Sequence, residues 1–260
     1  MESYFWYLKL KGFFEMIKRM IVTWAFAMSA TATFAGGHAQ SVDYAVGDKT
    51  FSAFVVKANN PKGNVFIVHD WNGLDDYEQK RAQMVADLGY NAIAIDLFGV
   101  DAVLEGRDDY RRETGALYQD RDEFRARISA AVEAGTAAVG EGDATLMGYC
   151  FGGAAVLEAA RAGMDLDKFV SFHGGLSTPQ GQDYSMTKGS VLLLHGSADP
   201  VSGMDDLAKV LDELNQAGIE HQAEVFGGAR HSFTVEGSRD YDVDADRKSW
   251  DAFVRFVDNS

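Results

Sequence analysis

The strand-turn-helix pattern around Cys150 constrains the fold of this chain more than any other feature of its sequence. An apolar run over 144–147 is typical of a buried strand, and the small and apolar residues over 154–160 are typical of a helix. Between them, residues 148–153 read G-Y-C-F-G-G. Glycine lets a strand and a helix pass closely, and a sharp turn of this kind holds its apex residue in strained backbone. The pattern therefore predicts a nucleophile elbow with Cys150 as the nucleophile.

Cys150 is the only cysteine in the 260 residues, so no disulfide within the chain can involve it. The helix predicted to begin after it would present free N–H groups, which lower the pKa of a thiol and can bind an oxyanion. The alternative is a buried, inert cysteine beside a glycine turn. Gly148 and Gly152, spaced around Cys150, favour the reactive interpretation.

Short apolar runs alternate with helical patterns from residue 50 to the end of the chain. Continuous apolar runs are typical of strands that are buried on both faces of a parallel sheet. We therefore predict an α/β fold: a single domain with a mostly parallel, twisted sheet and helices on both faces. The expected strands are an edge hairpin strand at 50–57 and buried strands at 65–68, 91–96, 144–147, 169–172, 191–194 and 221–226, and the expected helices lie at about 76–88, 124–132, 207–214 and 250–257.

The segment over 97–120 is long, charged and irregular in pattern. It predicts a lid or substrate loop, because long loops within compact domains are usually functional. In the following helix, the apolar spacing weakens at Gly135, which occupies the next position on the apolar face.

The formal net charge of −15 at pH 7 argues against binding to nucleic acid or to an anionic membrane surface, since both are polyanions. No G-x-G-x-x-G or P-loop pattern and no His-x-x-x-His pair is present, so neither a nucleotide cofactor nor a metal is expected. We expect a monomer that acts on a small molecule.

The first 39 residues are predicted to be a secretory signal peptide, with Met16 as an alternative start. Basic residues precede an apolar stretch over 20–28, and small residues at 30–32 and 37–39 offer cleavage sites. So short a stretch is a poor membrane span, and we expect a periplasmic or secreted protein without stable membrane association. An uncleaved N-terminal anchor is the alternative. A free thiol in an oxidising compartment favours a working Cys150.

Four polar residues, Asp70, Cys150, Asp199 and His231, each follow a predicted strand. The carboxyl ends of parallel strands meet at one edge of the sheet, so these side chains are expected to gather there. Histidine can take and return a proton near neutral pH, a carboxylate orients the imidazole, and a thiolate attacks a carbonyl. We therefore predict a catalytic triad of Cys150, His231 and Asp199.

Three further histidines, His69, His173 and His195, also lie at predicted strand ends. We interpret them as structural residues that form hydrogen bonds near the edge of the sheet. For Asp199 the structural alternative is a common Asp-Pro turn, and for His231 it is a glycine-rich loop. The catalytic interpretation of each residue is strengthened by the other and by the elbow.

The G-Y-C-F-G-G elbow, Asp199 in H-G-S-A-D-P and His231 in R-H-S-F resemble the dienelactone hydrolase family. The resemblance extends from about residue 50 to residue 257, and we assign residues 40–260 to one domain of this kind. It implies an α/β-hydrolase fold, no cofactor, and hydrolysis of lactones or esters through an acyl-cysteine intermediate. The order Cys150, Asp199, His231 along the chain agrees with that fold.

The resemblance also implies roles for residues around the triad. Backbone N–H groups at Phe151 and Trp71 match the oxyanion hole of the family. Asp70 matches a family glutamate that interacts with the resting cysteine, and a negative neighbour would raise the pKa of the thiol until substrate binds. Ser232, next to His231, is expected in the substrate pocket.

The chain departs from the family at two positions. The archetype binds its substrate's carboxylate with two arginines, and the matching residues here are Val100 and Val235. Without these arginines, a doubly anionic dienelactone loses its charge-assisted hydrogen bonds to the protein. The resemblance therefore predicts the class of reaction but not the substrate. Arg107, Arg111 and Arg112 lie within the 97–120 segment and could reach the pocket, although a solvated charged face is the commoner explanation.

Two other functions stay open at this point. One is thioester cleavage or acyl transfer by the same triad. The other is a binding protein that kept the fold without turnover, against which the complete triad argues.

Overall fold

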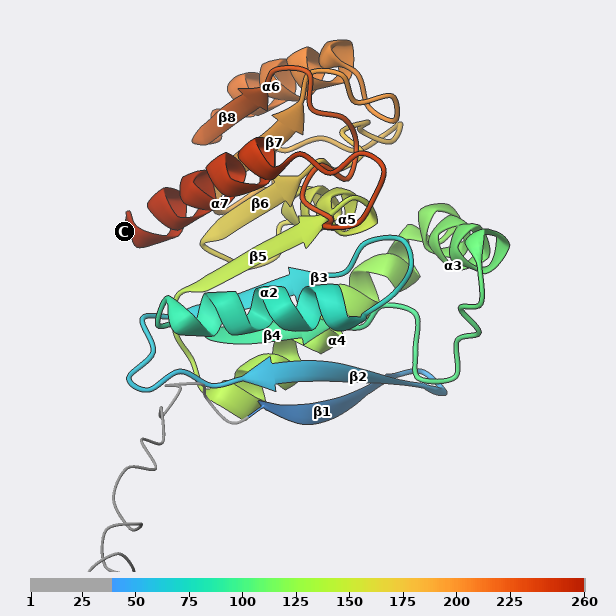
Figure 1. Ribbon diagram of the computed structural model, residues 1–260. Helices are drawn as coiled ribbons and strands as arrows, with labels where there is room; N and C mark the ends of the chain where they lie inside the picture. The colour runs from blue at the N-terminus through green and yellow to red at the C-terminus, as the bar shows by residue number, and fades with distance from the viewer. Residues whose placement is uncertain (1–38, 260) are drawn as a thin grey trace, which may run out of the picture. The chain divides into compact units, whose positions relative to one another are not determined.

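The computed structural model describes residues 39–259, which contain one sheet of eight strands in the order β1-β2-β4-β3-β5-β6-β7-β8 (Figure 1). β1 pairs antiparallel with β2 and β2 with β4, while all remaining pairs are parallel. None of the helices within residues 39–259 is both long and apolar enough to cross a membrane. The strands are β1 (Ala39–Val46), β2 (Lys49–Val56), β3 (Asn64–Val68), β4 (Asn91–Ile95), β5 (Ala144–Tyr149), β6 (Lys168–Phe172), β7 (Ser190–Gly196) and β8 (His221–Phe226).

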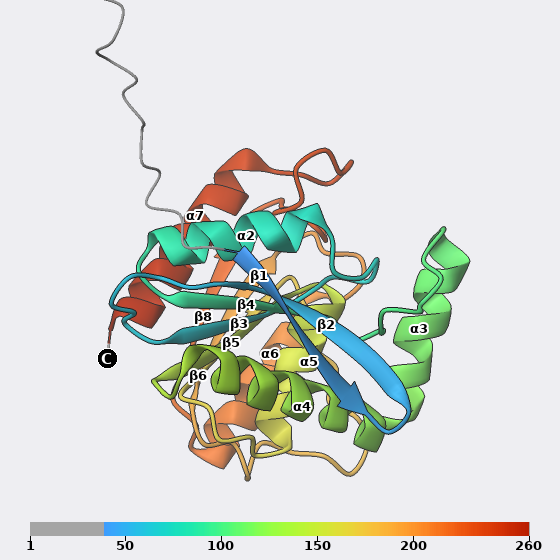
Figure 2. The ribbon, with the colours of Figure 1, turned by 90° about the horizontal axis from the view of Figure 1, so that it is seen from below.

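Helices cover both faces of the sheet, which confirms the predicted α/β-hydrolase architecture (Figures 1 and 2). Two helices pack on one face and three on the other, while α3 stands beyond the ends of the parallel strands. The first pair is α2 (Asp76–Asp87) and α7 (Val243–Asp258), the second group is α4 (Arg121–Val139), α5 (Phe151–Arg161) and α6 (Met204–Ala217), and α3 spans Arg107–Gln119.

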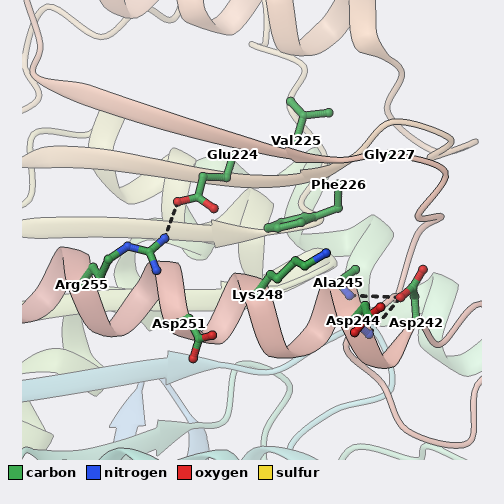
Figure 3. A pocket seen from close by; sticks show the side chains of 10 residues that line it. All are labelled: Glu224, Val225, Phe226, Gly227, Asp242, Asp244, Ala245, Lys248, Asp251 and Arg255. Carbon is green, nitrogen blue, oxygen red and sulfur yellow. Dashed lines mark hydrogen bonds and ion pairs between the residues drawn. The ribbon is translucent and has the colours of Figure 1, made fainter.

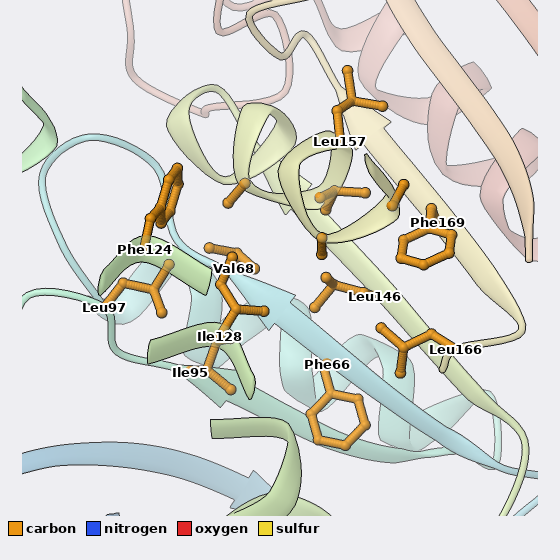
Figure 4. Close-up of a cluster of buried hydrophobic side chains, with 14 of the residues drawn as sticks. Phe66, Val68, Ile95, Leu97, Phe124, Ile128, Leu146, Leu157, Leu166 and Phe169 are labelled. Atoms are coloured by element: carbon orange, nitrogen blue, oxygen red, sulfur yellow. The ribbon is translucent and has the colours of Figure 1, made fainter. Parts of the chain in front are cut away.

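The apolar runs form two cores because successive side chains of a strand point to opposite faces. In β3, Phe66 and Val68 join the cluster beneath α4 and α5 (Figure 4), whereas Val65 and Ile67 join the cluster beneath α2 and α7. All four side chains are fully buried. This two-sided burial explains why the parallel strands read as continuous rather than alternating apolar runs.

The 97–120 segment differs from the prediction of an irregular loop, because it contains helix α3. Only two of its residues, Thr114 and Leu117, are buried, so the sequence lacks the apolar stripe by which helices are recognised. Ion pairs three residues apart, Arg111 with Asp108 and Arg112 with Asp109, lie along its surface.

The edge of the sheet also differs from the prediction. β2 was expected to be an edge strand, but β1 pairs with its outer side along all eight of its residues and forms the edge instead. β1 was not predicted: its apolar alternation is limited to Val42, Tyr44 and Val46, and only Tyr44 is buried. In α4, Gly135 keeps its place on the buried face, because a Cβ atom there would lie 2.7 Å from the Phe66 ring.

Residues 1–38 lie outside the described residues, and with them nearly all of the predicted signal peptide. Ala39, the last residue of the predicted signal peptide, is the first described residue and belongs to β1. Export, the cleavage site and the start at Met16 stay predictions.

Candidate active site

The site lies where the strand order reverses. The chain passes from β3 to β4 on one side of β3 and later returns to β5 on its other side, which opens a crevice at the carboxyl ends of β3 and β5. Asp70 and Trp71 follow β3 and Cys150 follows β5, while Asp199 and His231 come from the loops after β7 and β8. The fold therefore brings these segments to the same edge of the sheet.

Cys150 sits at the apex of the turn between β5 and α5, with φ 53° and ψ −111°. This left-handed backbone is strained for a residue with a side chain. A Cβ atom at Gly148 would lie 2.3 Å from the Gly152 carbonyl oxygen, and one at Gly152 would lie 2.3 Å from the Val68 carbonyl oxygen. Only glycine fits at either position, as the elbow pattern predicts.

Cys150, His231 and Asp199 form a continuous chain of contacts. His231 Nε2 lies 2.9 Å from Cys150 Sγ, and His231 Nδ1 lies 2.8 Å from Asp199 Oδ2. Asp199 Oδ1 accepts hydrogen bonds from the backbone N–H groups of Val201 and Ser202. The carboxylate is thus fixed on one side by its own loop and points its other oxygen at the imidazole.

The surroundings of His231 and Asp199 shift the pKa values of these two residues in opposite directions. Burial lowers the pKa of His231, but its hydrogen bonds to Asp199 and Cys150 and the negative charge of Asp199 outweigh burial and raise the pKa to about 10. Burial raises the pKa of Asp199, yet the hydrogen bond and charge of His231 and the two backbone N–H groups bring its pKa below the usual value. At neutral pH the imidazole accordingly holds a proton beside an ionised carboxylate.

Cys150 opens into a cavity of about 370 Å³, which also contains Trp71, Phe151 and His231. Phe151 is the first residue of α5, so its backbone N–H has no acceptor within the helix. The guanidinium of Arg107 lies 5.4 Å from the centre of the Trp71 ring. The complete lining is Trp71, Arg107, Thr114, Tyr118, Cys150, Phe151, Gly175, Pro200, Val201, His231, Ser232, Arg239 and Asp240.

The two arginines of the cavity differ in their partners. Arg239 forms two hydrogen bonds with Asp240, at 3.0 and 2.9 Å, which compensate its charge. Arg107 forms no ion pair within residues 39–259. Arg111 and Arg112, which the sequence also offered, pair with aspartates of α3 and do not line the cavity. One uncompensated cation therefore faces the nucleophile's pocket.

Asp70 precedes Trp71 in the chain and is buried. Burial raises its pKa to about 6, opposed by a hydrogen bond from the Asn72 backbone N–H and by the charge of His231. The described residues include no hydrogen bond between Asp70 and Cys150, and Asp70 is not part of the cavity lining. Its predicted effect on the thiol stays a prediction.

Ser232 lines the cavity, as expected of a residue next to His231, and has φ 59°. Its carbonyl oxygen accepts the Val235 N–H at 3.0 Å, which turns the chain sharply after His231. Val100 and Val235, which replace the arginines of the family archetype, are both outside the cavity lining.

The three other histidines form hydrogen bonds within the protein. His69 accepts the Leu97 N–H, and His195 contacts the Ser202 carbonyl oxygen at 3.0 Å. The ring of His173 lies next to the elbow itself. Among residues 39–259, no group of three or more histidine, cysteine or acidic side chains is placed to hold a metal ion.

Some cavity residues were not foreseen. Thr114 and Tyr118 come from α3, and the sequence analysis assigned no helix there. Spaced four residues apart, they lie on one face of that helix, a relation that appears only once α3 is recognised. Arg239 and Asp240 come from the loop before α7 and carry no pattern that distinguishes them from a solvated turn.

A second cavity, of about 460 Å³, lies between β8 and α7 (Figure 3). It contains none of the predicted site residues. Among its charged side chains, Arg255 pairs with Glu224 at 2.7 Å, and Asp242 accepts the N–H groups that begin α7.

Comparisons with known proteins agree with this geometry. The sequence matches the dienelactone hydrolase family over residues 51–260. It is 24% identical to a protein of Saccharolobus solfataricus named "Putative carboxymethylenebutenolidase", over 79% of this chain and 92% of that protein.

Among solved structures, the chain is similar to a dienelactone hydrolase-like promiscuous phosphotriesterase from metagenomic libraries, with 33% identity, a TM-score of 0.79, and coverage of 84% of this chain and 96% of that one. It also shares its fold with a dienelactone hydrolase of Anabaena variabilis, at 19% identity and a TM-score of 0.63, over 85% of this chain and 96% of that one. The chain belongs to the dienelactone hydrolase family and is a hydrolase of that family.

Proposed function

We propose that the protein hydrolyses carboxylic esters or lactones through an acyl-cysteine intermediate on Cys150. The observation that carries the proposal is the unbroken line from Cys150 Sγ to His231 Nε2 and from His231 Nδ1 to Asp199 Oδ2, at 2.9 and 2.8 Å. A scaffold without turnover has no need for all three groups in this order. The geometry of a nucleophile, a base and an orienting carboxylate is the requirement for acyl transfer to a side chain.

The reaction begins with Cys150 Sγ, and His231 holds the thiol proton as the sulfur attacks. Sγ attacks the carbonyl carbon, a carbon–sulfur bond forms, and the carbonyl electron pair moves to the oxygen. When the tetrahedral intermediate collapses, the carbon–oxygen bond to the leaving group breaks, and His231 donates its proton to the departing alkoxide. His231 then takes a proton from water, the hydroxide attacks the thioester, and the acid and the Cys150 thiolate are released.

The backbone N–H groups of Phe151 and Trp71 are proposed to stabilise the oxyanion. Both residues line the cavity with Cys150, and the N–H of Phe151 is left without a helical acceptor at the start of α5. Donors fixed in the backbone need no rearrangement as charge develops, which is the main advantage of an oxyanion hole.

The lining of the pocket favours esters that combine an apolar or aromatic group with a group that Arg107 can bind. Trp71, Tyr118 and Val201 supply apolar lining, while Arg107 is the cation without a partner. The absence of arginine at Val100 and Val235 therefore does not leave the pocket without positive charge. We propose ester or lactone substrates and leave acyl transfer to other acceptors as an outcome of the experiment.

The test is hydrolysis of a panel by residues 40–260 and by Cys150→Ala. The panel contains neutral activated esters, an anionic dienelactone, a thioester, and a neutral phosphotriester, which the name of the metagenomic relative suggests. We expect turnover of at least one ester or lactone and its loss in Cys150→Ala. Turnover that persists in Cys150→Ala would contradict the proposal, and products formed only with an added acyl acceptor would favour transfer.

We further propose that the protein is exported. The proposal rests on the residues of the N-terminal 39 positions alone, which carry basic, apolar and small-residue segments in the order of a signal peptide. N-terminal sequencing of the protein from a periplasmic fraction tests it, with Gln40 as the expected first residue. Full-length protein that stays with the cytoplasm would contradict it.

A further inference from the structure

The ring of His173 connects two segments of the site that are far apart in the sequence. His173 follows β6 and is fully buried. The Cys150 backbone N–H lies 3.2 Å from His173 Nδ1 and is shared with the Phe172 carbonyl oxygen at 3.0 Å. On the other side of the ring, Nε2 lies 2.8 Å from Thr234 Oγ1.

The hydrogen bonds determine the tautomer of His173. A backbone N–H can only donate, so Nδ1 carries no proton, and Nε2–H donates to the Thr234 hydroxyl. Burial lowers the pKa of His173 well below the usual value, and the positive charge of His231 lowers it further. The ring therefore acts as one acceptor and one donor held at a fixed separation.

This connection joins the strained positions of the site. Four residues other than glycine have positive φ within residues 39–259, and three of them are Cys150 at 53°, His173 at 39° and Ser232 at 59°. Strained backbone persists only where surrounding contacts hold it. The His173 ring accepts the backbone N–H of Cys150, and His173 is itself one of the three strained residues. The ring also binds Thr234, which lies two residues after Ser232. Its ring also packs against the imidazole of His231, with ring centres 5.4 Å apart.

Thr234 is anchored independently of the active site. Its hydroxyl lies 2.6 Å from Tyr77 Oη, and its carbonyl oxygen accepts a hydrogen bond from Arg81 at 3.0 Å, both from α2. Thr234 is buried. The His231 loop is thus attached at Thr234 to α2 and, through His173, to the backbone of the nucleophile.

We propose that His173 is a positioning residue whose ring joins the Cys150 backbone to the His231 loop and so sets the separation between Cys150 Sγ and His231 Nε2. The inference rests on the proposed function, because a fixed separation matters only if the proton passes between these atoms. A base displaced by about 1 Å can lower the rate about 100-fold. The role extends the structural hydrogen bonding that the sequence analysis predicted for this histidine.

The test uses variants that remove different hydrogen bonds of the His173 ring and of the Thr234 hydroxyl. His173→Asn keeps an acceptor near Nδ1, tolerates positive φ, and loses the contact with Thr234. Thr234→Val loses both bonds of the hydroxyl, whereas Tyr77→Phe loses only the bond that does not involve His173. Thr234→Ser restores the hydroxyl. Thermal unfolding checks that each variant is folded at the assay temperature.

Two readouts are measured on each protein: kcat and KM with the preferred ester, and the rate of Cys150 alkylation by iodoacetamide against pH. We expect His173→Asn and Thr234→Val to lower kcat about 10- to 100-fold with KM changed less than about threefold. The alkylation profile should shift as well, since the imidazole no longer sits beside the sulfur. Tyr77→Phe and Thr234→Ser should stay within about threefold of the unmodified protein.

The alkylation profile distinguishes the failure of this inference from the failure of the proposed function. If folded Thr234→Val matches Tyr77→Phe in kcat and in alkylation, the positioning role is wrong, whatever the substrate. Should His173→Asn not fold, the comparison of Thr234→Val with Tyr77→Phe and Thr234→Ser decides alone. An unmodified protein whose Cys150 alkylates like a free thiol and that turns over no ester would overturn both proposals.

Discussion

Two cavities in the described part of the chain, the one at Cys150 and the groove between β8 and α7, both contain charged side chains, yet they differ in how those charges are held. In the groove between β8 and α7, the paired side chains of Arg255 and Glu224 remain 59% and 40% exposed. In the active-site cavity, the paired side chains of His231 and Asp199 are only 11% and 0% exposed. Exposed pairs are screened by water, whereas buried pairs shift each other's pKa strongly.

Backbone strain divides the two regions in the same way. The active site contains Cys150 and Ser232 with positive φ, whereas no such residue other than glycine lines the groove. The groove is the larger of these two cavities, yet it lacks the strained backbone and the buried ion pair of the candidate active site. Burial, strain and a continuous chain of hydrogen bonds therefore mark the candidate active site, while cavity volume does not.

The largest expected contrast comes from the same chemical change made in each region. Asp199→Asn should lower kcat by about 10³- to 10⁴-fold, because an amide can hold the imidazole in the wrong tautomer and cannot stabilise the imidazolium. Glu224→Gln, the matched change in the groove, should leave kcat within about twofold. Steady-state kinetics on the preferred ester measures both. Equal losses in the two variants would erase the distinction between the cavities.

A smaller effect is expected at Arg107, the unpaired cation of the active-site cavity. Arg107→Gln should lower kcat/KM about 10-fold for an anionic ester and little for a neutral ester with the same leaving group, because a charge-assisted hydrogen bond is lost only for the anion. Arg111→Gln, on the exposed and paired side of α3, is the matched control. An unchanged ratio of anionic to neutral kcat/KM in Arg107→Gln would remove this residue from the pocket's specificity.

The pH dependence of stability should also differ between the regions. Folding raises the pKa of His231 to about 10 from an ordinary value of 6.5, so the protonated imidazole stabilises the fold. That contribution is complete below about pH 6.5 and is lost as pH rises through about 10. The melting temperature should therefore fall between pH 7 and pH 10 by at least about 2 °C more in the unmodified protein than in His231→Gln. Parallel curves for the two proteins would contradict the raised pKa.

The smallest effect is expected in the groove. Arg255→Gln breaks the ion pair with Glu224, and exposed pairs contribute about 1 kcal/mol or less to the free energy of unfolding. Urea unfolding should show a change of that size, and ester turnover should be unaffected. A loss of more than about 3 kcal/mol would mean that the groove is a structural element of the sheet edge.

Most of the fold could be predicted because the parallel strands β3 to β7 are buried on both faces and contain continuous apolar runs. The β8 prediction matches the observed strand at both ends, and Gly218 ends α6 in the left-handed conformation as its position suggested. β1 and α3 escaped prediction for the same reason. Each lies at the periphery with few buried residues, so its apolar pattern is weak and tertiary contacts stabilise it.

Residue types at strand ends predicted that Cys150, His231 and Asp199 would meet, and the structure brings the three side chains into contact, while their catalytic roles stay a prediction. The surroundings of the triad were less predictable. The sequence indicates that His173 follows a strand, but not that its ring lies between Cys150 and Thr234, 61 residues further along the chain. Contacts between loops depend on how the whole sheet is assembled, so the local sequence pattern around each loop does not predict them.

The central claim is that an acyl group is carried by Cys150, and trapping the intermediate tests it most directly. The protein is mixed with an activated ester that deacylates slowly and is quenched in acid, and its mass is measured before and after proteolysis. We predict a mass increase equal to the acyl group, located on the peptide that contains Cys150 and absent in Cys150→Ala. Continued turnover with no acyl group on Cys150, or with the group on another residue, would contradict the account.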